Sequence, residues 1–266
     1  MILILLFVLA VILVLFSVHT KRSLTVVSAY YDIPSKKSSD IYHERLKQFL
    51  GKLDCDLVFF TSSDLVQTLK SYRSKYLHRT KFHVVELEDL ECMKKYGLDF
   101  WKEQCAKSQD PAHVDKPLLG GIWYSKKEFL NRALQENPFG STHLAWVDAG
   151  IMDVPYEQDV LHINEKMLDP DDRMHMYGIQ KLTDDVYFDR PVNYLCGDTY
   201  YGTLEACEKH VYNYQKVFDQ YVENDRCAFD DQYLLNSLGV LYTHDYNIDY
   251  SAHEWRFLFK KLVGLY

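Results

Sequence analysis

Residues 143–151 read His143-Leu-Ala-Trp-Val-Asp-Ala-Gly-Ile151. The apolar run from Leu144 to Val147 follows the turn-like sequence Asn137-Pro-Phe-Gly-Ser141. A short apolar run between turn signals predicts a buried strand. Asp148 would then lie at the carboxyl end of this strand, where ligands bind in open α/β sheets. Asp148 either contributes to such a site, as a contact to a metal or a phosphate, or simply begins a turn.

Strand-like and helix-like segments alternate upstream of residue 143. Strands are expected at 23–30, 56–61 and 81–87, and helices at 40–53, 63–72 and 123–136. This alternation is typical of a parallel sheet with helices on both faces. We therefore predict one α/β domain with a mostly parallel central sheet flanked by helices.

The second half of the chain is expected to add further strands and helices to this domain. Strands are predicted at 174–179 and 192–196, and a helix near 100–101. Helices are predicted at 204–224 and 230–238, and residues 255–262 form a basic amphipathic segment. Helix caps are expected at Ser39 or Asp40, at Ser63 or Asp64, and at Thr203, because these side chains can accept hydrogen bonds from free backbone N–H groups.

The N-terminus carries a membrane-segment signature. Residues 2–18 contain no charged side chain, and about 17 to 25 apolar residues span a bilayer. The run exceeds the apolar core of a signal peptide and lacks a clear cleavage site, which favours a retained anchor over a cleaved signal. We predict a single-pass anchor at 1–20 and one soluble domain at 21–266. Under the positive-inside rule, Lys21 and Arg22 after the segment predict that the soluble domain is cytoplasmic. Anchored enzymes of the secretory pathway are usually lumenal. The side of the membrane therefore stays open.

Composition narrows the classes of partner. The net charge is -8 and basic residues are scattered, which argues against nucleic acid as a partner. The 21 tyrosines suit hydrogen-bonded sugar or nucleotide sites. The six cysteines include no Cys-x-x-Cys pair and no zinc-site spacing, and we expect mostly buried free thiols.

Motifs across the soluble region resemble the HtrL/YibB-like (WlaTC/HtrL) family of glycosyltransferases. The most specific are Lys126-x-x-Phe-Leu-x-x-Ala-x-x-x-Asn-Pro-Phe-x-Ser141 and Trp146-x-Asp-Ala-Gly-Ile151. Three weaker ones are Ser28-Ala-Tyr-Tyr-Asp-Ile33, Gly197-Asp-x-x-Tyr-Gly202 and Phe229-Asp-Asp-Gln232. The resemblance implies a GT-A-like (nucleotide-diphospho-sugar transferase) fold, a nucleotide-sugar donor, and a glycan or lipid-linked saccharide as acceptor.

The leaving diphosphate needs either a divalent metal held by carboxylates, Mn²⁺ or Mg²⁺, or else fixed cations of the protein. Asp148 is the candidate metal ligand, in the position of the first acid of a DxD motif. Gly150 replaces the second acid, so Asp148 would either hold the metal weakly or hydrogen-bond a ribose or donor sugar. His253 is a second candidate ligand, with a purely structural role as the alternative.

Asp230 and Asp231 are the candidate catalytic acids. The resemblance favours Asp231 as general base or acceptor-binding group, and repulsion between the two carboxylates would raise the pKa of one. Alternatively, they only stabilise the N-terminus of a helix. Asp198, after Gly197, is a candidate for binding donor or acceptor hydroxyls, or a turn residue.

The remaining candidate binding residues belong to the donor side. Tyr30, Tyr31 and Asp32 would contact base and ribose, unless the tyrosines serve only packing. Lys126 or Lys127 would face the diphosphate, unless both are solvated. Arg45 is a weaker candidate, and Trp146 and Gly150 complete the predicted site.

Two other classes of function compete with transfer. A catalytically inactive nucleotide- or glycan-binding protein would keep the same fold, and Gly150 in place of an acid keeps that alternative open. A metal-dependent hydrolase is disfavoured, because the sequence contains no His-Asp-x-x-His cluster.

Overall fold

A computed structural model describes residues 23–188 and 194–266. The predicted anchor at 2–18 and part of the predicted strand at 192–196 lie outside these ranges. Within them, no helix has both the length and the apolar character needed to cross a bilayer.

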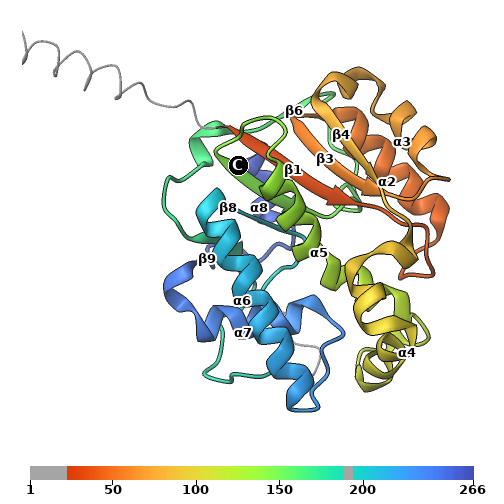
Figure 1. The fold of residues 1–266 in the computed structure, drawn as a ribbon. Coiled ribbons are helices and arrows are strands. Elements are labelled where there is room, and N and C mark those ends of the chain that lie inside the picture. Colours follow the sequence, from red (N-terminus) through yellow and green to blue (C-terminus); the bar gives the residue numbers. More distant parts are fainter. Residues whose placement is uncertain (1–22, 189–193) are drawn as a thin grey trace, which may run out of the picture.

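A seven-stranded sheet forms the centre of the domain (Figure 1). Its strands, in spatial order, are β4 (Thr80–Val84), β3 (Asp56–Thr61), β1 (Leu24–Ala29), β5 (His143–Val147), β8 (Thr199–Thr203), β7 (Met174–Tyr177) and β9 (Tyr246–Asp249). All neighbours are parallel except the two pairs that include β8. The prediction of a mostly parallel sheet is confirmed. A separate parallel pair joins β2 (Leu53–Asp54) to β6 (Leu161–His162).

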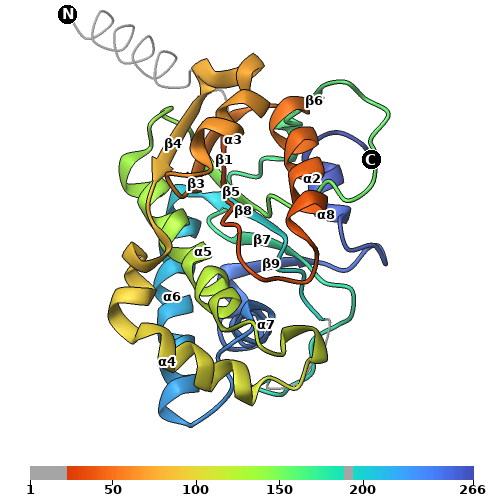
Figure 2. The ribbon, with the colours of Figure 1, turned by 90° about the vertical axis from the view of Figure 1, so that its right-hand side faces the viewer.

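Helices cover both faces of this sheet (Figure 2). The α-helices are α2 (Ser39–Lys52), α3 (Val66–Tyr72), α4 (Glu91–Lys107), α5 (Pro117–Glu136), α6 (Leu204–Glu223), α7 (Asp231–Leu241) and α8 (Phe257–Leu262). Short 3-10 turns are η1 (Ser74–Arg79), η2 (Leu87–Asp89), η3 (Pro111–His113), η4 (Glu165–Met167) and η5 (Thr243–Asp245). Helices α2 and α8 lie on one face, and α4, α5 and α6 on the other.

The two faces carry two separate hydrophobic cores, because successive strand residues point to opposite sides. In β5, Leu144 and Trp146 join the core beneath α4, α5, α6 and α7, whereas Ala145 and Val147 join the core beneath α2, α3 and α8. Both sets are at most 2% exposed, so β5 is buried on both faces, as the apolar run at 144–147 predicts.

Several predicted elements were wrong or incomplete. Strands β8 and β9 were not predicted, because both include polar or glycine residues that weaken the strand pattern. The expected strand at 192–196 is replaced, in its described part, by a single bridge between Leu195 and Gly178. Helix α5 begins at Pro117, earlier than expected.

The predicted helix caps had mixed outcomes. Ser38 and Leu65 occupy the N-cap positions of α2 and α3, without side-chain cap bonds, so the predicted caps there were wrong. The Thr203 cap of α6 is confirmed, since its side chain accepts from Ala206 N. Buried free thiols are also confirmed for all six cysteines.

The order of strands reverses between β1 and β5. From β1 the chain proceeds outward through β3 to β4, and then returns to place β5 on the opposite side of β1. Such a switch point leaves a crevice at the carboxyl ends of the two strands, because the following connections diverge. The residues after Ala29 and Val147 meet at that crevice.

Candidate active site

A cleft of about 260 Å³ lies at the carboxyl ends of β1 and β5. It is lined by residues 29–31 after β1, by residues 148–151 after β5, and by side chains from α2 and α5. Among its described lining residues, three are basic and two are acidic: Arg45, Lys126, Arg256, Asp148 and Asp198. Lys126 and Arg256 are also paired with Asp231 and Asp153, which do not line the cleft, so the charge around it is close to balanced.

Lys126 binds three oxygens at the floor of the cleft. Its ammonium lies 2.9 Å from Asp148 Oδ1 and 2.7 Å from Asp231 Oδ2, and donates to the carbonyl of Gly197 at 2.9 Å. Three acceptors match the three hydrogens of an ammonium group. Burial by itself would lower the pKa of Lys126, but the two carboxylates outweigh it and the pKa is raised. Lys126 is therefore a fixed charge.

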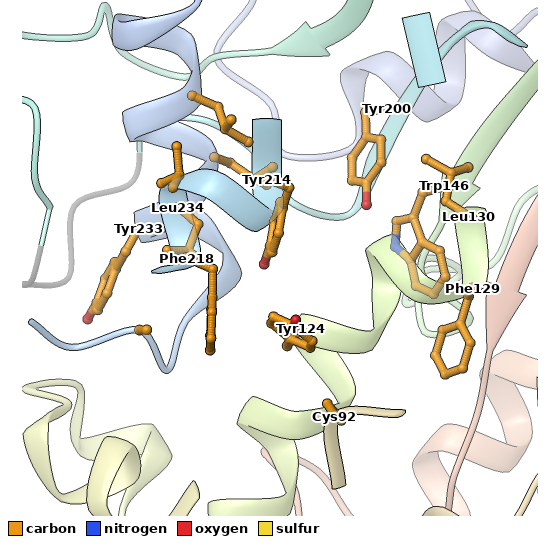
Figure 3. Packing of buried hydrophobic residues seen from close by; sticks show 14 of the residues in the cluster. Cys92, Tyr124, Phe129, Leu130, Trp146, Tyr200, Tyr214, Phe218, Tyr233 and Leu234 are labelled. Atoms are coloured by element: carbon orange, nitrogen blue, oxygen red, sulfur yellow. The ribbon is translucent and has the colours of Figure 1, made fainter. Parts of the chain in front are cut away.

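Trp146 orients Asp148. The indole Nε1 donates to Asp148 Oδ1 at 2.7 Å, and the ring stacks on Phe129 of α5 with centroids 6.2 Å apart. Figure 3 shows these two rings side by side in the hydrophobic core. The Asp148 side chain is 36% exposed, so its other oxygen remains available to a ligand.

Asp198 approaches Asp148 from the segment before β8. Its carbonyl accepts from Asp148 N at 2.8 Å, and its side chain lines the cleft. Burial, reinforced by the Asp148 charge, raises the pKa of Asp198 to about 8. Burial also raises the pKa of Asp148, although Lys126 opposes this. The raised pKa favours the protonated form of Asp198, which can donate a hydrogen bond.

Asp230 and Asp231 begin α7 and face different groups. Asp230 caps the helix through a 2.9 Å bond from Gln232 N to Oδ1, while its Oδ2 lies 3.7 Å from His113 Nε2. Burial, followed by the Asp231 charge, raises the pKa of Asp230 to about 7. Asp231 binds Lys126 and does not line the cleft itself. Asp231 thus holds the site's lysine in place.

Gly197 is required where the chain passes Asp231. A Cβ at position 197 would lie 2.9 Å from Asp231 Oδ2, closer than real contacts allow. Glycine therefore lets the 197 carbonyl and the Asp231 carboxylate reach the same ammonium group.

Two tyrosines and two arginines also line the cleft: Tyr30, Tyr31, Arg45 and Arg256. Tyr31 stacks on Phe129, whereas Tyr30 packs near Tyr42 of α2. Arg256 donates to Ile151 O at 3.0 Å and pairs with Asp153. Arg256 was not predicted as a site residue, and only its position in a basic C-terminal segment could have drawn attention to it.

Six predicted site residues are not among those that line the cleft: Asp32, Lys127, Gly197, Asp230, Asp231 and His253. Asp32 accepts from Ser39 Oγ at 2.8 Å near the rim. Lys127 points away and pairs with Gln215 Oε1 at 2.7 Å. His253 is exposed. Of the two predicted lysines, Lys126 is thus the one that faces the cleft.

The side chains at this site do not fit a divalent metal. Such an ion takes several oxygen ligands, yet the described residues include no group of three or more His, Cys, Asp or Glu side chains placed to hold one. The Lys126 ammonium already adjoins Asp148 Oδ1, and position 150 offers no side chain. His253, the other predicted ligand, is not among the residues that line the cleft with Asp148.

Comparisons with known proteins were made at the level of families, curated sequences and solved structures. No family model matches the chain, and no curated protein matches it. Among solved structures, that of mouse xyloside xylosyltransferase 1 in its apo form is similar, with a TM-score of 0.46 and 12% identity. The match covers 86% of this chain and 84% of that one. At this identity and TM-score, the similarity assigns neither a family nor an activity.

Proposed function

We propose that this chain is a nucleotide-sugar-dependent glycosyltransferase with a GT-A-like fold, related to the HtrL/YibB-like family. It would transfer a sugar from a nucleoside-diphosphate donor to a hydroxyl of a glycan or lipid-linked saccharide. The observation that carries this proposal is the cleft at the β1–β5 switch point, where cations, acids and tyrosines converge. Nucleotide ligands bind at this position in open α/β sheets.

The cleft residues divide into a donor part and a reaction part. Tyr30 and Tyr31, at the end of β1, offer aromatic surface and hydroxyls for base and ribose. Asp148, with one oxygen directed by Trp146 and Lys126, can accept hydrogen bonds from sugar hydroxyls. Asp198 can donate one while it is protonated. In this arrangement, Asp231 positions Lys126 rather than contacting the acceptor.

The proposal extends to the uncharged run at residues 2–18, which would anchor the enzyme as a single-pass membrane protein. An anchored transferase would meet lipid-linked or membrane-bound acceptors at the bilayer surface. Insertion of the full chain into membranes, tested by resistance to alkaline carbonate extraction, would support this part independently of the site.

A donor screen tests the central proposal. The full chain in detergent is incubated with UDP-, GDP-, ADP- and CMP-sugars, and thermal unfolding and donor hydrolysis are followed. A ligand at about 100 times its dissociation constant stabilises the folded state by about 2.7 kcal/mol. We expect one donor to raise the melting temperature and to be slowly hydrolysed, and Asp148→Asn to lose hydrolysis.

The outcome separates transfer from silent binding. Thermal protection without hydrolysis, even with a wide range of acceptors, would indicate the catalytically inactive binding protein. If no donor protects the chain, or if Asp148→Asn matches the wild type in both measurements, the proposed site is wrong.

A further inference from the structure

Arg45 is a cation in the cleft to which the described residues supply no acidic partner. Its Nη1 donates to the Gly150 carbonyl at 3.3 Å, and its guanidinium lies 5.9 Å from the centre of the Tyr42 ring. In the described part of the chain no carboxylate forms an ion pair with Arg45, whereas Lys126 and Arg256 are both paired with acids. A half-buried guanidinium with spare N–H groups is suited to bind an anion.

The position of the missing second acid faces this arginine. A Cβ at position 150 would lie 3.1 Å from Tyr42 Cε1 and 3.9 Å from Arg45 Nη1. The first position, Asp148, adjoins the Lys126 ammonium. Both places at which a DxD pair would hold a divalent ion are therefore next to a fixed cation of the protein itself.

Arg45 and Lys126 also approach from opposite faces of the sheet. Arg45 comes from α2, which covers one core, and Lys126 comes from α5, which covers the other. A group seated at the strand ends would have one cation on each side. Lys126 has its three hydrogens engaged and reduces the negative charge of Asp148 and Asp231. Within the described residues the Arg45 side chain donates only to Gly150 O, so it keeps other N–H groups for direct contact.

We propose that Arg45 binds the diphosphate of the donor and that donor binding needs no divalent metal. The planar fork of a guanidinium can bond two phosphate oxygens at once, and supplies the charge that a metal ion otherwise provides. This inference rests on the proposed function and adds the group that holds the leaving diphosphate.

Calorimetric titration with UDP, GDP, CDP and ADP tests the inference on the full chain. Each is titrated in EDTA and again with Mn²⁺, into the wild type, Arg45→Gln and the control Lys47→Gln. Lys47 lies on the same helix, its side chain is 49% exposed, and it does not line the cleft. Each matching nucleoside, which lacks phosphate, is titrated in parallel.

We expect the preferred diphosphate to bind equally well in EDTA and in Mn²⁺. Arg45→Gln should weaken diphosphate binding by at least about tenfold and leave nucleoside binding unchanged, since a charge-assisted contact is lost. Lys47→Gln should bind like the wild type. Gly150→Asp places a carboxylate beside the guanidinium and leaves the sequence of α2 unchanged, with a tight 3.1 Å contact to Tyr42 Cε1, and should show the same selective loss in EDTA.

Distinct results would overturn the two proposals. Binding that requires Mn²⁺, or an Arg45→Gln protein that binds diphosphate as Lys47→Gln does, would refute the role of Arg45 and leave the glycosyltransferase proposal standing. If none of the four diphosphates binds under either condition, both proposals fail.

Discussion

The ammonium of Lys126 lies 2.7 Å from Oδ2 of Asp231, and these side chains are only 5% and 6% exposed. The pair joins the middle of α5 to the first turn of α7, two elements far apart in the sequence. Because a buried charge without a partner is unfavourable, each residue depends on the other. The floor of the cleft is thus part of the structural framework.

Lys126→Met should destabilise the protein strongly. Removing one partner of a buried ion pair costs about 3–5 kcal/mol, because the other charge is left uncompensated. Here Asp231 and Asp148 would both lose their cation. Urea unfolding followed by tryptophan fluorescence measures the change in the free energy of unfolding.

The neighbouring Lys127→Met is the matched control. Its ammonium bonds the neutral Gln215 amide at 2.7 Å, and its loss should cost only about 1 kcal/mol. If both variants lose the same free energy of unfolding, the ion pairs of Lys126 stabilise the protein no more than the hydrogen bond of Lys127 does.

Gly197→Ala should disturb the same cluster through packing alone. The added Cβ would meet Asp231 Oδ2 at 2.9 Å, and overpacking of this kind costs about 1–3 kcal/mol. Gly51→Ala in α2 should have the opposite sign, since its Cβ would make only an ordinary 3.6 Å contact and alanine favours a helix. Thermal unfolding compares both with the wild type. A stable Gly197→Ala protein would contradict the close approach.

The local sequence pattern was enough to predict the position of Asp148. The apolar run at 144–147 implies a strand whose end carries Asp148, and the structure has it there. The pairing of Lys126 with Asp231, and of Arg45 with position 150, depends on how distant elements pack, which local periodicity does not encode. Strand β8 was missed because Gly197-Asp198 before it and Gly202 within it signal a turn, although its tyrosines and threonines favour a strand. Its pairing with β5 decides the outcome.

The pH dependence of stability should change in Asp230→Asn. Burial and Asp231 raise the folded-state pKa of Asp230 to about 7, above its ordinary value of 3.8. Between these values the folded state binds more protons than the unfolded state, so the free energy of unfolding due to Asp230 falls as pH rises from about 4 to about 7. Asparagine can still accept from Gln232 N and does not titrate.

The measurement is the difference in free energy of unfolding between Asp230→Asn and the wild type. It should shift in favour of the variant from pH 4 to pH 8. His113, Lys36 and Asp231 also act on Asp230 or lie close to it, and all three are present in both proteins. A pH-independent difference would mean that Asp230 keeps its ordinary pKa.

The six cysteines should be unreactive in the folded protein. All are buried and free, with Cys105 the most exposed at 9%, and burial raises the pKa of Cys92 and Cys207 to about 12. Because the thiolate is the reactive form, a thiol reagent should label none before unfolding. All six should react in denaturant without a reductant. A lower count there would reveal a disulfide.

Trp146→Phe should misplace the Asp148 carboxylate without weakening donor binding. Phenylalanine keeps a ring to stack on Phe129 but removes the 2.7 Å bond to Asp148 Oδ1, at a cost of about 1 kcal/mol in stability. Once a donor is known, kcat for its hydrolysis should fall by about tenfold with little change in KM, since the carboxylate is misplaced while Tyr30 and Arg45 still hold the nucleotide. Trp123→Phe, in the same cleft, is the control, because within the described residues its indole forms no hydrogen bond to an acid of the site. An unchanged kcat in Trp146→Phe would mean that Lys126 alone fixes Asp148.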